Sequence, residues 1–225
     1  MKNLRPNAQR AKYALFMILI VMAADIISAI SGYLQFDLLK SVEDGKLFFP
    51  ETFENNDLRE RIIGITSMIL FIISAVTFIM WFRRAYYNLG KKTIYLRFSD
   101  DWAAGSWFVP IISLYRPFQM MKQLFQETKK VLSLSKIETN LSTDIVVWWW
   151  ALWIINSFVG QFVFRYSMRA DTLDELLLCT KVGILNNLLG IPLAVVAAKL
   201  IKEYSNVEPL LFEEKIEASN IALSQ

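Results

Sequence analysis

Residues 62–82 read IIGITSMILFIISAVTFIMWF and contain no Lys, Arg, Asp or Glu. A helix needs about 20 residues to cross the hydrocarbon core of a bilayer. Helix is the expected form of such a run, because lipid offers no water to pair with free backbone amides and carbonyls. The stretch therefore predicts a membrane-spanning helix.

Three other apolar runs have a similar length, and only the first contains a charge, Asp25. Hydrophobic residues make up 55% of the chain, not far above a soluble protein, so their clustering carries the prediction rather than their total. The first run is longer than the apolar part of a signal peptide and is interpreted as a retained span. The predicted spans are 13–36, 62–82, 145–164 and 182–198.

These runs predict an all-α fold: a polytopic helical membrane bundle with four transmembrane helices. One membrane domain is expected over 1–204, followed by a polar tail over 205–225. A fifth apolar stretch, 102–115, is short, contains Pro110 and ends at Arg116. It predicts a re-entrant or interfacial segment rather than a span. The stretch 118–132 then predicts an amphipathic helix with a basic face, of the kind that lies in the membrane interface.

Charge is distributed unevenly between the spans. The segment 83–144 has ten basic and five acidic residues, a net charge of +5, whereas 37–61 has four basic and seven acidic residues, a net charge of −3. Lys and Arg near spans favour the cytoplasmic side. We therefore expect both termini and 83–144 in the cytoplasm. Basic residues on both sides of 102–115 favour a segment that does not cross.

The composition removes much of ordinary enzyme chemistry. The chain has one Cys and no His, so it cannot form an internal disulfide, a Ser-His-Asp unit or the usual zinc sites. A net charge of +3 is too small to suggest nucleic-acid binding. We expect no catalytic residues, no metal and no cofactor, and an enzyme is the less favoured class. The enzyme alternative is a cytoplasmic-face site for Mg²⁺ and phosphate beside Arg97, using Asp100, Asp101 or Glu127.

Asp25 is the most unusual residue of the sequence, because a carboxylate in the middle of a span costs about 2.5–3.5 kcal/mol on insertion scales. It predicts either a proton or cation site, or a group that joins helices through Ser28, Asn156 or Asn186. Amides within spans more often join helices than line a path. A small oligomeric transporter or channel is therefore the alternative function, with a candidate polar site at Asp25, Asn156, Asn186 and Asn187.

A second candidate site lies in the basic segment, where cations and aromatic residues alternate. Each Lys or Arg near the surface attracts anionic lipid head groups by about 1 kcal/mol. The Trp residues at 148–150 and 153 are interpreted as an interfacial belt. The favoured function is a non-enzymatic module that binds a membrane protein partner, a second copy of itself or anionic lipid. Its candidate residues are Arg83, Arg84, Trp102, Trp107, Arg116 and Lys122.

Three motifs carry a resemblance to a known family: WFRRAYYNL at 81–89, RFSDDWAAGSWFVPIISLYRPFQMMKQLF at 97–125 and WWWALW at 148–153. The chain resembles the bacterial membrane family called "domain of unknown function 4328" over roughly 65–204. This resemblance implies a multi-pass protein of the bacterial inner membrane without assigned activity, and it supplies no catalytic residues. The family usually has a Trp pair where Ser106 and Trp107 stand here. Since Pro110 frees carbonyl groups at membrane depth, this segment is the first place to expect a site.

Overall fold

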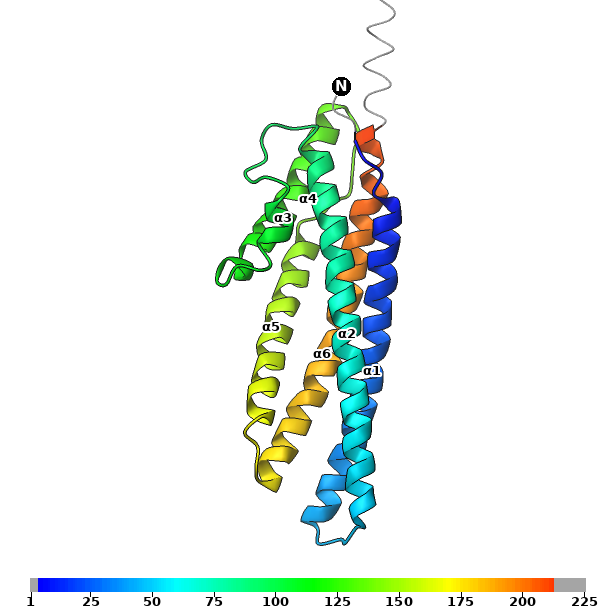
Figure 1. Cartoon of the computed structure of the whole chain (residues 1–225). Helices are drawn as coiled ribbons and strands as arrows, with labels where there is room; N and C mark the ends of the chain where they lie inside the picture. Colours follow the sequence, from blue (N-terminus) through cyan, green and yellow to red (C-terminus); the bar gives the residue numbers. More distant parts are fainter. Residues whose placement is uncertain (1–3, 213–225) are drawn as a thin grey trace, which may run out of the picture. The chain divides into compact units, whose positions relative to one another are not determined.

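The computed structural model describes residues 4–212, and every regular element in that range is helical. Four helices are long and apolar enough to cross a membrane, which confirms the all-α membrane bundle predicted from the sequence. The elements in chain order are α1 (Ala8–Glu43), α2 (Pro50–Leu89), α3 (Trp102–Gly105), the 3-10 turn η1 (Ile112–Leu114), α4 (Arg116–Leu134), α5 (Asp144–Ser167) and α6 (Leu173–Val207) (Figure 1).

Each expected span lies inside one long helix, and the helices extend further than the apolar runs. With 36 residues in α1 and 40 in α2, the 1.5 Å rise per residue makes them about 54 and 60 Å long, against about 30 Å for a hydrocarbon core. Both helices are therefore longer than a hydrocarbon core is thick, and their charged ends are helical as well. Prediction from hydropathy locates the apolar core of such a helix but not its ends.

The described residues form two compact units, although the sequence predicts one membrane domain over 1–204. Unit 1 contains 4–16, 75–150 and 196–212. Unit 2 contains 17–74 and 151–195. Each of the four long helices contributes one part to each unit. The two units are described separately below.

In unit 1, the apolar face of α4 is covered by the protein itself. Met121, Leu124 and Phe125 on this face are at most 1% exposed. Two hydrogen bonds join α4 to the neighbouring helices: Tyr86 Oη donates to Gln123 Oε1 at 2.7 Å, and the Thr128 and Tyr204 hydroxyls lie 3.2 Å apart. The apolar face therefore packs against α2 and α6, and the placement of this helix in the membrane interface stays a prediction.

The segment 102–115 forms no helix long enough to cross a bilayer. It consists of α3, a series of turns and η1. Pro110 is followed by Ile111 at φ 67°, a strained left-handed conformation for a β-branched residue. The side chains at this bend point away from the core, since Phe108 and Ile111 are 76% and 75% exposed.

The carboxyl end of unit 1 is more ordered than a polar tail beginning at 205 would be. Helix α6 continues to Val207, and Glu208 and Leu211 beyond it are buried. In the sequence, the charged side chains at 202, 203 and 208 suggest exposure to solvent. In the structure, Glu208 is instead buried and accepts hydrogen bonds from Asn7 and Asn88. Residues 213–225 of the expected tail lie outside the described residues.

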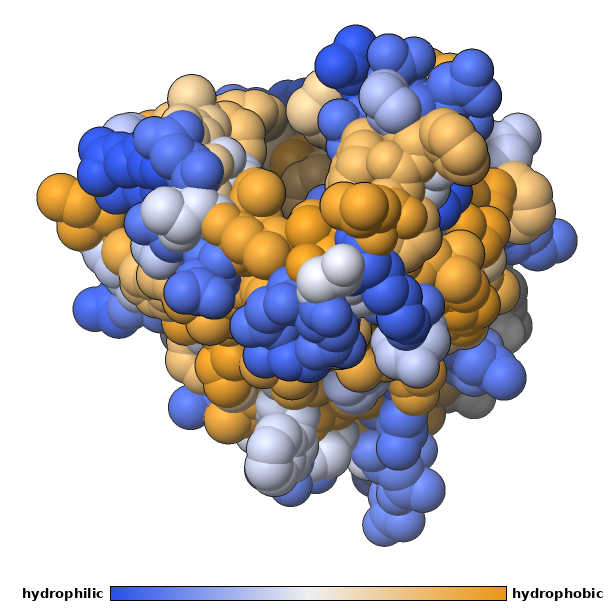
Figure 2. Space-filling view, turned by 90° about the horizontal axis from the view of Figure 1, so that it is seen from below, coloured by the Kyte–Doolittle hydropathy of each residue, from blue (hydrophilic) through white to orange (hydrophobic). Residues whose placement is uncertain are grey.

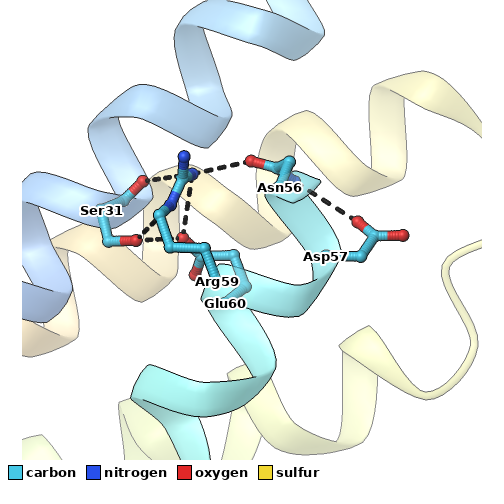
Figure 3. A network of polar contacts seen from close by, with 5 residues as sticks. All are labelled: Ser31, Asn56, Asp57, Arg59 and Glu60. Atoms are coloured by element: carbon cyan, nitrogen blue, oxygen red, sulfur yellow. Dashed lines mark hydrogen bonds and ion pairs between the residues drawn. The ribbon is translucent and has the colours of Figure 1, made fainter. Parts of the chain in front are cut away.

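In unit 2, a polar network joins α1 to α2 near the α1–α2 loop (Figure 3). Arg59 donates from Nε to Ser31 Oγ at 2.9 Å and from Nη2 to Asn56 Oδ1 at 2.7 Å. Ser31 Oγ in turn donates to Glu60 Oε1 at 2.5 Å. Seen from this end of the molecule, hydrophilic residues surround patches of apolar ones (Figure 2). The network fixes the register between α1 and α2.

Candidate functional site

A cavity of about 320 Å³ lies among the four helix segments of unit 2. Its walls mix one carboxylate, two amides and two hydroxyls with apolar and aromatic side chains. All four membrane-spanning helices contribute residues to it. The lining residues are Val21, Ala24, Asp25, Ser67, Met68, Phe71, Trp153, Asn156, Ser157, Gly160, Asn186 and Leu193.

The Asp25 carboxylate is seated directly against the backbone of α6 at Gly190. A Cβ atom added to Gly190 would lie 2.2 Å from Asp25 Oδ2 and 2.9 Å from Asp25 Cγ. Only a residue without a side chain permits this approach. Gly190 is therefore part of the site, because it gives the carboxylate its position beside the cavity.

Asp25 has no hydrogen bond or ion pair with any residue in the described part of the chain. Ser28, one of its expected partners, instead faces α2, where its hydroxyl lies 3.2 Å from that of Ser67. A carboxylate in lipid that lacks a partner retains most of its desolvation cost. The geometry thus does not supply the hydrogen bond that a purely structural role for Asp25 requires.

The two amides of the cavity are also unsatisfied. Asn156 Oδ1 and Asn186 Oδ1 are buried, and neither accepts a hydrogen bond within residues 4–212. The Asn186 amide packs against Gly160, where its Nδ2 is 3.4 Å from the position of an added Cβ. Buried polar atoms are nearly always paired with protein or water. These two amide oxygens therefore lack a hydrogen-bond donor, which a water molecule or a bound ligand would supply.

Helix α6 contains Pro192 beside the cavity and continues through it. Proline has no backbone N–H, so the carbonyl of Leu188 one turn earlier loses its helical donor. In membrane helices such freed groups are tolerated where water or another polar group can reach them. This irregularity falls in the same turn as Gly190.

Three of the four predicted intramembrane residues meet at this cavity: Asp25, Asn156 and Asn186. The fourth, Asn187, does not line it. Sequence reasoning missed the α5 stripe of Trp153, Ser157 and Gly160, which with Asn156 follows a spacing of three and four residues. That helical spacing was a readable signal that these residues share one face.

The polar side chains that line the cavity suit a ligand with a single positive charge. The cavity offers one carboxylate with neutral amides and hydroxyls, and among the described residues no three His, Cys, Asp or Glu side chains are grouped so that they could hold a metal ion. Divalent ions usually take several carboxylates. One carboxylate balances a single positive charge, so the site is suited to a proton or a monovalent cation.

Some of the predicted lipid-binding residues of unit 1 are already paired or packed within the protein, and others could still contact a lipid. The Arg83 guanidinium pairs with Asp101 at 2.5 Å and lies 4.0 Å from Asp100, so its charge is already balanced. The Trp107 ring packs among Phe78, Trp149 and Trp150 at centroid distances of 6.0, 6.3 and 6.1 Å. Neither side chain offers a free binding group.

Two of the three remaining cations of this set, Arg116 and Lys122, lie on aromatic rings. Arg116 is stacked over Phe98 at 4.3 Å and lies 5.6 Å from the Trp102 ring, and Lys122 is 5.9 Å from the Phe118 ring. Arg84 is half-buried near the end of α2. We call Trp102, Arg116 and Lys122 the cationic ridge. Of the acids proposed for an enzyme, Asp100 and Asp101 face Arg83, and Glu127 pairs with Lys130 at 3.8 Å.

A family model described as a domain of unknown function, DUF4328, matches residues 45–206. The chain therefore belongs to this family. The match includes α5 and the cavity-lining part of α6, whereas Asp25 and the rest of α1 precede it. No curated protein and no solved structure matches the chain.

Proposed function

We propose that this membrane protein binds a monovalent cation, either H⁺ or an alkali ion, at Asp25 and carries it across the bilayer. The observation that carries the proposal is a carboxylate without a partner, in the middle of a span, beside a cavity with two unsatisfied amides. Ionisable groups inside membranes typically mark ion pathways. Four spans are few for a complete pathway, so the proposal includes assembly of several copies.

Binding removes the main energetic penalty of the site. An isolated charge at this depth costs about 2.5–3.5 kcal/mol on insertion scales. A proton neutralises the carboxylate, and an alkali ion balances its charge while the amide and hydroxyl oxygens complete the coordination. A purely structural carboxylate would instead be expected to accept hydrogen bonds from neighbouring helices. Ser28 bonds Ser67 rather than Asp25, which favours the binding role.

The test replaces Asp25 with Asn, which keeps the shape and removes the charge. In proteoliposomes, ion flux driven by a H⁺, Na⁺ or K⁺ gradient should fall to the level of protein-free vesicles. Asp37→Asn is the matched control, because this acid is on the same helix and exposed, and its flux should equal that of the wild type. Equal flux for Asp25→Asn and wild type would exclude Asp25 as the ion site.

A second function, binding of anionic lipid, is supported by the cationic ridge and the exposed apolar bend at Phe108 and Ile111. The bend offers apolar contact to acyl chains while Arg116 and Lys122 offer charge to a phosphate. In this proposal the ridge and both termini face the cytoplasm of a bacterial cell, because the +5 segment 83–144 contains it.

The lipid proposal predicts a selective loss of affinity in the double variant Arg116→Gln, Lys122→Gln. At about 1 kcal/mol per cation, the loss should approach 30-fold for phosphatidylglycerol. Native mass spectrometry of the detergent-solubilised protein, titrated with this lipid, measures it. The control variant Lys129→Gln, Lys202→Gln removes two exposed cations elsewhere. If both double variants retain the lipid equally, the ridge is not a specific site.

A further inference from the structure

Polar residues on α1 repeat every three positions between the loop end of unit 2 and the cavity. They are Ser31, Ser28 and Asp25, and this spacing keeps them near one face of the helix. Each serine is bonded to α2: Ser31 donates to Glu60 at 2.5 Å, and Ser28 lies 3.2 Å from Ser67. Ser67 itself lines the cavity that contains Asp25. We call these five residues the polar ladder.

The steps of the polar ladder are short. Residues three apart on a helix are separated by about 4.5 Å along the axis. One water molecule, with hydrogen bonds of about 2.8 Å on each side, covers such a distance. Direct hydrogen bonds cover the Glu60–Ser31 and Ser28–Ser67 steps. The Ser31–Ser28 step and the step from Ser67 across the cavity to Asp25 have no direct bond, so the proposed path includes water at both.

The chemistry of the ladder favours a proton over a metal ion. A hydroxyl donates one hydrogen and accepts others, so it can accept a proton on one side while it releases its own on the other. An alkali ion would have to separate the Ser28–Ser67 pair and shed its water, with no carboxylate between Glu60 and Asp25 to replace it. The ladder thus offers a proton a path that it does not offer to Na⁺ or K⁺.

Glu60 is the outermost titratable group of the ladder. Its side chain is 29% exposed, while Ser31 behind it is 4% exposed. Among the described residues it is in contact with one charge, that of Arg59 at 3.3 Å on its own helix, and with the neutral Ser31 on α1 (Figure 3). Water can reach Glu60, and Ser31 lies buried behind it, whereas Ser28 and Ser67 are half-buried.

We infer that the ion exchanged at Asp25 is the proton, and that it enters at Glu60 and passes through Ser31, Ser28 and Ser67. This inference rests on the function proposed above. A hydronium ion gives its proton to the Glu60 carboxylate. Each hydroxyl then gains a proton on one side and releases one on the other, and the Asp25 carboxylate ends as the neutral acid. No other bond is broken, and the charge of the serines is unchanged.

The experiment compares Glu60→Gln with Asp57→Asn, an exposed acid three residues earlier on α2 that contacts only Asn56 within the described range. The full-length protein is reconstituted in liposomes, and proton flux after a pH jump is followed with a trapped dye. Because a positioned acid–base group typically contributes about 10²–10⁴-fold to a proton-transfer rate, Glu60→Gln should slow the flux about 100-fold or more. Asp57→Asn should leave it unchanged.

Two further measurements separate a blocked path from a damaged site. The carbonyl band of protonated Asp25, assigned in difference infrared spectra by its loss in Asp25→Asn, should remain in Glu60→Gln at equilibrium. Ser31→Ala, which keeps the Arg59–Glu60 pair, should slow the flux in the same way, whereas exposed Ser133→Ala should not.

Each outcome bears on a different claim. Wild-type flux in both Glu60→Gln and Ser31→Ala would overturn the ladder and leave the ion site at Asp25 intact. Flux of Na⁺ or K⁺ without protons would overturn the proton assignment. Unchanged flux in Asp25→Asn would overturn the proposed function itself, whatever the ladder variants show. Slow flux in both ladder variants, with an unchanged Asp25 band, supports the inference.

Discussion

Replacing Gly190 with Ala is expected to destabilise the protein by about 2–3 kcal/mol, the range of overpacked cores. The added methyl would lie 2.2 Å from Asp25 Oδ2 and 2.9 Å from Cγ, closer than real contacts allow. Asp25 is a short side chain, so relief requires movement of α1 or α6. In an open helical position the same change would instead gain about 1 kcal/mol of helix propensity.

Gly64 supplies the matched control, because no atom lies within 4 Å of a Cβ added there. Gly64→Ala should leave stability unchanged or raise it by up to about 1 kcal/mol. Thermal unfolding in mild detergent would show the difference, and Gly190→Ala should lower Tm by about 4–12 °C if each kcal/mol shifts Tm by about 2–4 °C.

The double variant Asp25→Ala, Gly190→Ala identifies the cause. If the carboxylate is what the new methyl meets, removing both should recover much of the lost stability, a coupling expected of residues in contact. Gly190→Ala that behaves like Gly64→Ala would mean that α6 is not seated against Asp25. The cavity would then need a different geometry, and the ion site would lose its main structural support.

The four spans are predictable because they depend on a local property, the absence of charge over about 20 residues. The stripe at Trp153, Asn156 and Gly160 is also visible as helical spacing. Its orientation toward Asp25 is not predictable in the same way, because a helix that is apolar on all sides gives no signal of which face turns inward. Which face of α5 turns toward Asp25, and therefore where the cavity lies, is known only from the structure.

In α4, the amphipathic pattern likewise predicts the apolar face but not what covers it. The spacing of Met121, Leu124 and Phe125 identifies the apolar face, but the same pattern fits a face covered by lipid or by protein. Here Tyr86 and Tyr204, distant in sequence, determine the answer. Trp107 is comparable, since its indole belongs to a packed aromatic cluster that depends on α2 and α5 meeting.

The role of Glu208 could not be predicted from the sequence for the same reason, because its hydrogen-bond partners are far away in the chain. Its carboxylate accepts hydrogen bonds from Asn88 Nδ2 at 2.7 Å and from Asn7 Nδ2 at 2.9 Å, across 120 and 201 residues. Asn88 also donates to the Arg5 carbonyl at 2.8 Å and accepts from the Arg5 amide at 2.9 Å. One buried acid therefore joins α2, the segment after α6 and the chain before α1.

Glu208→Ala should destabilise unit 1 by about 2–5 kcal/mol, because two buried amide groups lose an acceptor at about 1–3 kcal/mol each. Asn7 and Asn88 are 4% and 0% exposed, so water does not readily replace the carboxylate. The control is Glu203→Ala, five residues earlier on α6, whose 3.7 Å pair with Lys199 is partly exposed. Exposed pairs contribute about 0–1 kcal/mol.

Limited trypsin digestion reports this loss at the amino-terminal segment itself. Arg10 lies on α1 just after the docked residues 5–7, and cleavage there requires the segment to leave its site. Glu208→Ala should be cut at Arg10 faster than Glu203→Ala, and Glu208→Gln should be intermediate, because its amide keeps one acceptor oxygen but places a donor against a donor. Equal cleavage of the two alanine variants would show that the carboxylate does not hold the segment. Since the docked segment continues directly into α1, an early loss of protection at Arg10 would also show that this end of α1 depends on Glu208 rather than on its own apolar packing.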